Sequence, residues 1–173
     1  TVLILALGWT CASASPVMVI EDTADTPVSL RYWIPEQTLT IEQASDPANA
    51  DKYAPVQATA LPARNRDVWY HFRIAYIGAP TQPLFLSFNQ ALYDEIEVFQ
   101  TSAGGWRSKK GGLNYPYSIR DIDSRYLAFA LTATQDELVD VYFRARSMHY
   151  TIMDPRLQTG WLYVNNVVFQ STI

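Results

Sequence analysis

The fold class follows from one stretch of the sequence, Val68-Trp69-Tyr70-His71-Phe72-Arg73-Ile74. Large apolar side chains occupy every second position and continue to Tyr76, while Trp69, His71, Arg73 and Ala75 lie between them. Successive side chains of a β-strand point to opposite faces of the sheet, so this period of two predicts a strand with one face in the core. We therefore expect β-structure here, with an outer face that carries polar and aromatic groups.

Other segments share this character, because they are short, rich in β-branched and aromatic residues, and separated by glycine or proline turns. They are residues 17–20, 28–33, 84–88, 95–99, 126–131, 139–146 and 161–169. A short helix is predicted over residues 38–44, where Thr40 and Gln43 have the spacing of a capping box, and a loop over residues 46–66. No amphipathic run is long enough for a crossover helix, so the pattern predicts an all-β, antiparallel jelly-roll sandwich.

The first residues have the pattern of an export signal. An apolar run from Val2 to Leu7 precedes Ala12-Ser13-Ala14, and small residues at the two alanine positions are what signal peptidase accepts. We expect residues 1–14 to be the remnant of a signal peptide and residues 15–160 to form one exported domain. Lipidation of Cys11, the single cysteine, is the weaker alternative because the bulky Trp9 stands close before it.

Charge and motif content argue against several functions. The net charge is -4 and the longest basic run is Lys109-Lys110, which does not favour a nucleic-acid binder. His71 and His149 have no metal-ligand spacing, and there is no Gly-x-Ser-x-Gly motif. We therefore expect a protein that recognises a ligand or partner and is not an enzyme.

The strand predicted at residues 139–146 alternates as well, with Asp140, Tyr142, Arg144 and Arg146 on the polar face. If it shares a sheet with residues 68–74, one outer face collects the ligand-binding candidates Trp69, His71, Arg73, Tyr142, Arg144 and Arg146. Aromatic rings stack on the CH faces of sugars, and arginine binds hydroxyl or carboxylate groups through forked hydrogen bonds. The alternative is a solvated sheet face with ordinary cross-strand pairs.

A second group of candidates lies in and around a long predicted loop. The ligand-binding candidates there are Trp106, Tyr115, Tyr117, Arg120 and Arg125. In the alternative interpretation the tyrosines pack under the loop and the arginines pair with carboxylates. Asp94, Asp121 and Asp123 also raise calcium as a cofactor, because Ca²⁺ takes about six to eight oxygen ligands, often from loops.

Several motifs, in their order along the chain, resemble the type-two extracellular domain of bacterial seven-transmembrane receptors with diverse intracellular signalling modules. They are Tyr32-Trp33, Leu39-Thr40-Ile41-Glu42, Val68-Trp69-Tyr70-His71-Phe72, Leu92-Tyr93-Asp94-Glu95-Ile96-Glu97-Val98-Phe99, Gly104-Gly105-Trp106, Arg120 and Arg125-Tyr126-Leu127-Ala128-Phe129. The resemblance covers roughly residues 17–157. At His71 the family commonly has arginine, and Arg73 on the same strand face is placed to take over its role.

This resemblance implies a jelly roll similar to carbohydrate-binding modules, in the periplasm, as part of an inner-membrane protein. A seven-helix membrane segment would follow, with residues 161–173 as its lead-in, and then a histidine kinase or diguanylate cyclase output. The implied function is a sensor for a carbohydrate or similar small ligand. The alternatives are a calcium-responsive module, a protein-protein interaction module and the accessory module of a secreted carbohydrate-degrading enzyme, and a homodimer is left open.

Overall fold

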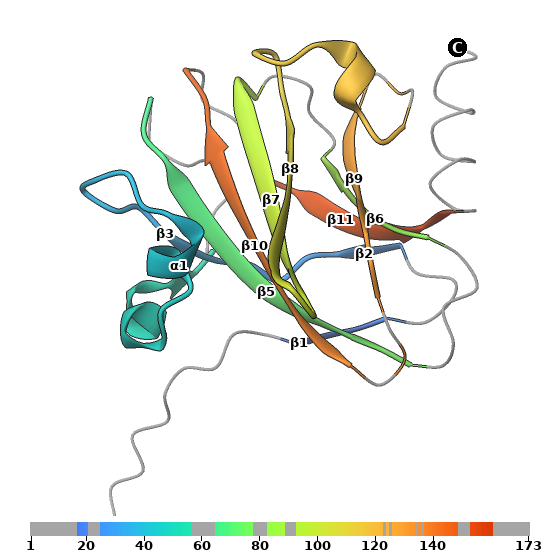
Figure 1. The fold of residues 1–173 in the computed structure, drawn as a ribbon, viewed down its shortest axis with the longest axis horizontal. Coiled ribbons are helices and arrows are strands. Elements are labelled where there is room, and N and C mark those ends of the chain that lie inside the picture. The colour runs from blue at the N-terminus through green and yellow to red at the C-terminus, as the bar shows by residue number, and fades with distance from the viewer. Residues whose placement is uncertain are drawn as a thin grey trace, which may run out of the picture.

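The computed structural model describes residues 17–20, 25–56, 65–77, 83–88, 93–122, 124, 126–133, 135, 137–148 and 153–160. Most of these residues belong to two β-sheets, with a short helical segment beside the larger one (Figure 1). Within the described residues, the strands pair antiparallel except for β1 with β5. The prediction of an all-β, mostly antiparallel protein is confirmed.

The large sheet brings the two alternating segments of the sequence together. Its main path is β4 (Ala54–Pro55), β3 (Arg31–Trp33), β5 (Val68–Tyr76), β10 (Leu138–Arg146), β7 (Glu95–Ser102) and β8 (Gly105–Gly111), and β1 (Val17–Ile20) pairs with the second half of β5. In the register of β5 with β10, Trp69 lies opposite Arg144, His71 opposite Tyr142 and Arg73 opposite Asp140. The expectation that these two strands share a sheet is therefore confirmed.

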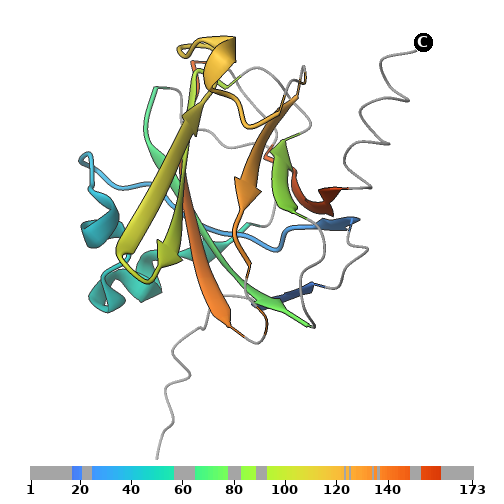
Figure 2. The ribbon, with the colours of Figure 1, turned by 45° about the vertical axis from the view of Figure 1, so that its right-hand side comes forward.

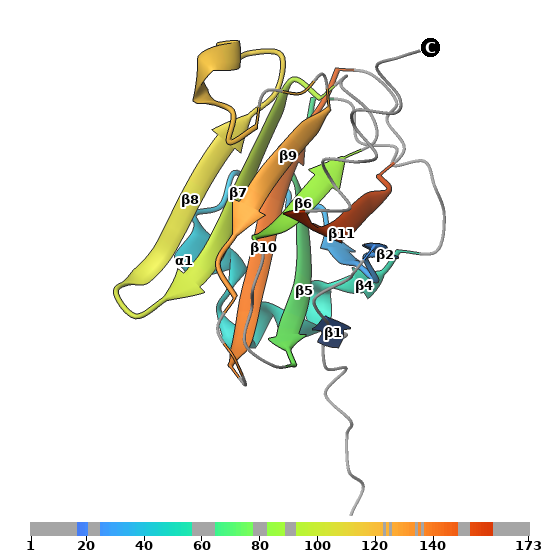
Figure 3. The same ribbon diagram turned by 90° about the vertical axis from the view of Figure 1, so that its right-hand side faces the viewer.

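The small sheet covers the other side of the core. Its strands are, in order, β2 (Asp25–Pro27), β11 (Pro155–Thr159), β6 (Leu84–Phe88) and β9 (Leu127–Leu131). Figure 3 shows these strands in front of β5 and β10. A 3-10 helix, η2 (Tyr117–Ile119), lies between β8 and β9 in the chain.

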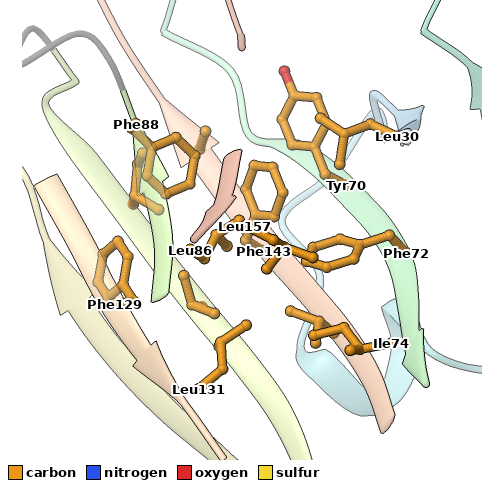
Figure 4. Packing of buried hydrophobic residues seen from close by; sticks show 14 of the residues in the cluster. Leu30, Tyr70, Phe72, Ile74, Leu86, Phe88, Phe129, Leu131, Phe143 and Leu157 are labelled. Atoms are coloured by element: carbon orange, nitrogen blue, oxygen red, sulfur yellow. The ribbon is translucent and has the colours of Figure 1, made fainter. Parts of the chain in front are cut away.

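The hydrophobic core lies between the two sheets. It contains the inward-pointing residues that the alternation predicts, including Tyr70, Phe72 and Phe143, which are fully buried. Figure 4 shows them facing the apolar side chains of the small sheet, and the rings of Tyr70 and Phe143 stack with centroids 4.5 Å apart. Burial of one such side chain contributes roughly 1.5–3 kcal/mol, so this layer holds the two sheets together.

Part of the outer face of the large sheet is also covered. Residues 38–53, which we call the helical cover, contain α1 (Ile41–Ala44) and the 3-10 helix η1 (Pro47–Lys52). Figure 2 shows them on the side of the large sheet that is remote from the small sheet. Thr40 caps α1 in the predicted capping box, since its Oγ1 accepts a hydrogen bond from the Gln43 amide while Gln43 Oε1 accepts one from the Thr40 amide.

The helical cover buries a second apolar cluster that is separate from the core. Leu39, Ile41, Ala44 and Tyr53 pack there with Trp69, Phe99 and Tyr142. Leu39, Ile41, Ala44 and Tyr53 belong to the cover. Trp69, Phe99 and Tyr142 belong to the strands of the large sheet. At this end of the sheet, the outer face is therefore an interior surface and not the solvated face of the alternative interpretation.

Some expected elements differ from the observed ones. The described part of the predicted loop at residues 46–66 contains η1 and β4, because Asp46 caps the 3-10 helix by accepting a hydrogen bond from the Ala48 amide at 2.9 Å. The predicted strand at 28–33 is observed only at its end, as β3. The strands β8 and β11 are not predicted from the sequence. β8 is a polar strand at the edge of its sheet and so lacks an apolar alternation, and β11 begins at a proline, which is typical of a turn.

Other expectations lie outside the described residues. They are the signal remnant at residues 1–14 and the strand at residues 161–169. In the part of the chain that the structure describes, no helix has the length and apolar character needed to cross a membrane.

Candidate functional site

A cleft of about 430 Å³ opens between the helical cover and the outer face of the large sheet. The sheet contributes to its lining Arg31 of β3, His71 and Arg73 of β5, Thr101 of β7, Trp106 of β8, and Asp140 and Tyr142 of β10. The cover contributes Ala44, Ser45, Asp46, Pro47, Ala50 and Tyr53. The cleft therefore joins side chains from five strands and one helical segment.

Strand register explains why these side chains meet. Arg31 lies opposite His71, and His71 lies opposite Tyr142, which forms one cross-strand row on the outer face. Arg73 lies opposite Asp140 in the next row, and Trp106 lies opposite Thr101 on the neighbouring strand pair. Because side chains at directly opposed positions of neighbouring strands contact one another, the two rows form a continuous floor.

His71 and Asp140 are the closest polar pair of the floor. The Nε2 atom of His71 lies 2.8 Å from Oδ1 of Asp140. The imidazole also stacks on the ring of Tyr142, with centroids 4.0 Å apart and planes 8° apart. The carboxylate and the stacked ring together orient the His71 side chain.

Two aromatic side chains, those of Trp106 and Tyr53, contact the Tyr142 ring of the floor. The ring of Trp106 meets Tyr142 edge to face at 5.5 Å, and the ring of Tyr53 meets Tyr142 in the same manner at 6.0 Å. Burial raises the pKa of Tyr142 to about 12, a rise to which the Asp140 carboxylate adds and which Arg73 opposes. Burial likewise raises the pKa of Tyr53. Both phenols are therefore neutral hydrogen-bonding groups at ordinary pH.

Tyr53 and Arg31 attach the cover to the sheet. The Tyr53 hydroxyl donates a hydrogen bond to the Ala44 carbonyl at 3.1 Å, which joins the last residue of the cover to the end of α1. The Arg31 guanidinium donates through Nη2 to the Tyr53 carbonyl. The cover thus rests on side chains that also line the cleft.

The structure separates the six candidates of the outer face. It places His71, Arg73 and Tyr142 in the cleft, whereas Trp69 is fully buried beneath the cover and stacks on Phe99 at 5.4 Å. Arg144 and Arg146 belong to a cluster of ion pairs outside the cleft lining.

This ion-pair cluster contains Arg144, Arg146, Asp67, Glu95 and Glu97. The Nη2 atom of Arg144 lies 2.7 Å from Glu95 and 2.9 Å from Glu97. Arg146 holds the buried carboxylate of Asp67 through two contacts of 2.7 and 2.8 Å. These two arginines are engaged by carboxylates of the chain itself.

The candidates of the loop group do not gather at one place. Trp106 joins the cleft, while Arg120 lies over the ring of Tyr117 at 4.3 Å and donates to the Ser124 carbonyl at 2.7 Å. Burial raises the pKa of the Tyr115 phenol, and the nearby Glu95 carboxylate adds to this rise. Arg125 lies outside the described residues.

Calcium binding by Asp94, Asp121 and Asp123 stays a prediction. Oδ2 of Asp121 contacts Lys109 at 2.7 Å and accepts a hydrogen bond from the Ala130 amide, and Asp94 accepts one from the Met148 amide. Asp123 lies outside the described residues, and among those described no three His, Cys, Asp or Glu side chains are grouped to hold a metal ion.

Sequence reasoning missed several residues of the cleft, among them Asp140, Arg31 and Tyr53. Asp140 is predicted on the outer face by alternation, yet its role as the partner of His71 depends on strand register. Arg31 precedes the Tyr32-Trp33 motif and is placed by its pairing with β5. Tyr53 lies in the segment predicted as a loop, and no periodic signal marks it.

One comparison with known proteins gives a match. A family model described as 7TMR-DISM extracellular 2 matches residues 26–159. No curated protein matches the chain. The matched residues include every residue that lines the cleft.

Proposed function

Because the chain belongs to the 7TMR-DISM extracellular 2 family, whose members are extracellular domains of seven-transmembrane receptors, we propose that it is the ligand-sensing domain of such a receptor. The ligand is a carbohydrate or a similar small polar molecule that binds in the cleft. The domain would lie in the periplasm and pass its signal through the inner membrane to a histidine kinase or diguanylate cyclase.

The observation that carries this proposal is the composition of the cleft. The rings of Trp106, Tyr142 and Tyr53 line the cleft, and its polar groups include the guanidinium groups of Arg31 and Arg73. Rings bind the CH faces of a sugar, and planar guanidinium groups bind hydroxyls or a carboxylate through paired hydrogen bonds. A volume of about 430 Å³ lies within the usual range of small-molecule sites.

The two-sheet architecture is compatible with the jelly roll of carbohydrate-binding modules, and we include that likeness in the proposal. The helical cover gives such a domain a means of signalling. A ligand that contacts both the sheet and the cover would favour the conformation in which the cover packs against the sheet. A difference in affinity between two conformations shifts their populations.

A glycan array and a thermal-shift assay with the array's hits test the proposal. We expect binding by the wild-type domain and at least a tenfold loss of affinity in Arg73→Gln, because Arg73 lines the cleft. Arg107→Gln is the matched control, since it removes the same charge from an exposed position of β8 outside the cleft lining. Equal binding by wild type and Arg73→Gln would move the site elsewhere, and no binding to any glycan would refute a carbohydrate ligand.

An interaction module of the same receptor class is the second candidate. On the second half of β5, Val19 lies opposite Ala75, which lies opposite Leu138. Val19 is 56% exposed and Leu138 46% exposed, so this row presents an apolar surface that a second copy of the domain would cover. Sedimentation of wild type and Leu138→Lys tests it, and a monomer in both would exclude the dimer.

A further inference from the structure

Two tyrosine hydroxyl groups belong to the cleft lining, and they have different partners. The hydroxyl of Tyr53 donates to the Ala44 carbonyl at 3.1 Å. The hydroxyl of Tyr142 makes no hydrogen bond with any residue in the described part of the chain. Only its ring has partners there, namely His71, Trp106 and Tyr53. The Tyr53 hydroxyl therefore stabilises the fold, whereas the Tyr142 hydroxyl can bond a molecule in the cleft.

The burial of Tyr142 makes this difference meaningful. The residue is 8% exposed, and a buried hydroxyl without a hydrogen bond lowers stability. Tyr70 provides a contrast, because its hydroxyl is sealed inside the core with no partner among the described residues, whereas that of Tyr142 is not sealed. The Tyr142 side chain lines the cleft, so a bound molecule can supply the missing hydrogen bond.

Asp140 lies beside Tyr142 with a free acceptor of its own. The two residues are two positions apart on β10, so their side chains project from the same face of the sheet. Oδ1 of Asp140 is engaged by His71, while Oδ2 has no partner among the described residues. The side chain is 38% exposed, so that oxygen is accessible.

These two groups complement a pair of neighbouring hydroxyls. An ionised carboxylate only accepts hydrogen bonds, whereas a phenol can donate one. A vicinal diol offers one hydroxyl that donates to Asp140 and an adjacent one that accepts from Tyr142. Sites that bind a ligand hydroxyl through buried polar groups reject analogues without it, because the protein group is then left unpaired.

We propose that the Tyr142 hydroxyl and the free carboxylate oxygen of Asp140 bind a vicinal diol of the sugar and set the specificity of the cleft. The inference rests on the proposed function and deepens it. It predicts that the ligand is a sugar ring or polyol with two adjacent free hydroxyls, and that deoxy analogues at either position are rejected.

The first test needs no ligand and compares the melting temperatures of Tyr142→Phe and Tyr53→Phe. Each variant removes one hydroxyl from the cleft and keeps the ring. Tyr142→Phe is expected to melt at or above the wild-type temperature, and Tyr53→Phe about 2–4 °C below it, because only the second change breaks a hydrogen bond within the chain. A fall in melting temperature for Tyr142→Phe as large as that for Tyr53→Phe would assign its hydroxyl to the fold and overturn the inference.

The second test probes a printed array of hexoses, hexuronic acids and disaccharides, together with 2-, 3- and 4-deoxyglucose, with the wild type, Tyr142→Phe and Arg107→Gln. We expect Tyr142→Phe to lose at least tenfold in affinity for every glycan that the wild type binds, while Arg107→Gln, which changes an exposed residue outside the cleft lining, keeps the wild-type pattern. Asp140→Asn should lose the discrimination against deoxy sugars.

The outcomes separate the two proposals. If the wild type binds glycans and Tyr142→Phe binds them equally well, the inference fails and the sensing function stands. If the wild type binds none, the carbohydrate ligand fails and the inference fails with it.

Discussion

The outer face of the large sheet has two ends that look alike in the sequence and differ in the structure. At one end, Arg144 and Arg146 are surrounded by Glu95, Glu97 and Asp67. At the other end, Arg73 and Tyr142 face a cleft beneath the helical cover. Both ends carry arginine beside aromatic residues on the same two strands, yet only one of them lines the cleft of about 430 Å³.

The difference comes from the neighbouring strand. Arg144 lies opposite Glu97 and Arg146 opposite Glu95, so β7 supplies a carboxylate at each of these two positions. Toward the cleft, Tyr142 lies opposite Phe99, and Thr101 bonds the backbone of Asp140. β7 therefore engages the arginines of β10 at one end of the face, whereas toward the cleft it places no carboxylate opposite Tyr142.

The strongest test of this comparison substitutes one arginine at each end. We expect Arg144→Gln to lower the free energy of unfolding by about 3 kcal/mol, because three largely buried carboxylates would lose their shared partner. Arg73→Gln should cost less than about 1 kcal/mol. Urea unfolding of both variants measures the difference, and equal losses would show that the two ends are energetically alike.

Alkaline pH should lower the free energy of unfolding, because several tyrosine hydroxyls are buried. The pKa of Tyr142 is raised to about 12, and burial also raises the pKa values of Tyr53, Tyr70 and Tyr93. The unfolded chain releases these protons near pH 10 while the folded chain keeps them, so stability is fully present below about pH 10 and falls above it.

We expect each of these phenols to contribute a loss of about 1 kcal/mol between pH 9 and pH 11. Urea unfolding at each pH, combined with the ultraviolet absorbance of tyrosinate, measures the effect. The loss should be smaller in Tyr142→Phe, which has one such phenol fewer. A stability that stays constant up to pH 11 would contradict the burial of these hydroxyls.

The smallest expected effect concerns the helical cover. Thr40→Ala removes the side chain that caps α1 and should cost about 1 kcal/mol. Thr38→Ala is the control, because Thr38 is exposed and lies outside the capping box. Hydrogen exchange should show faster opening of α1 in Thr40→Ala, with β10 unaffected. If β10 also opens faster, the cover and the sheet unfold as one unit.

Local patterns predict the strands and their faces but not their partners. The period of two in residues 68–76 and 139–146 places Tyr70, Phe72 and Phe143 in the core, as observed. The capping box at Thr40 is equally local and is also observed. Both signals depend only on residues close together in the chain.

The candidate site depends on contacts between distant residues, which is why only part of it is predicted. His71, Arg73 and Tyr142 are predicted as ligand candidates from their strand faces and Trp106 as a candidate of the loop group, and all four line the cleft. Trp69 occupies the same face of β5, yet the cover packs over it. Nothing in the pattern of β5 distinguishes Trp69 from His71, because the distinction is made by residues 38–53.

The helical cover has a further property in the way it joins the sheet. The chain leaves the large sheet at Trp33 and returns at Ala54, and the two strands at these points, β3 and β4, pair with each other. The cover is thus a single insertion within a hairpin. An insertion of this kind can be exchanged or reshaped without altering the core or the strand order. Changes in this one segment would therefore alter the lining of the cleft while the large sheet keeps its strand order.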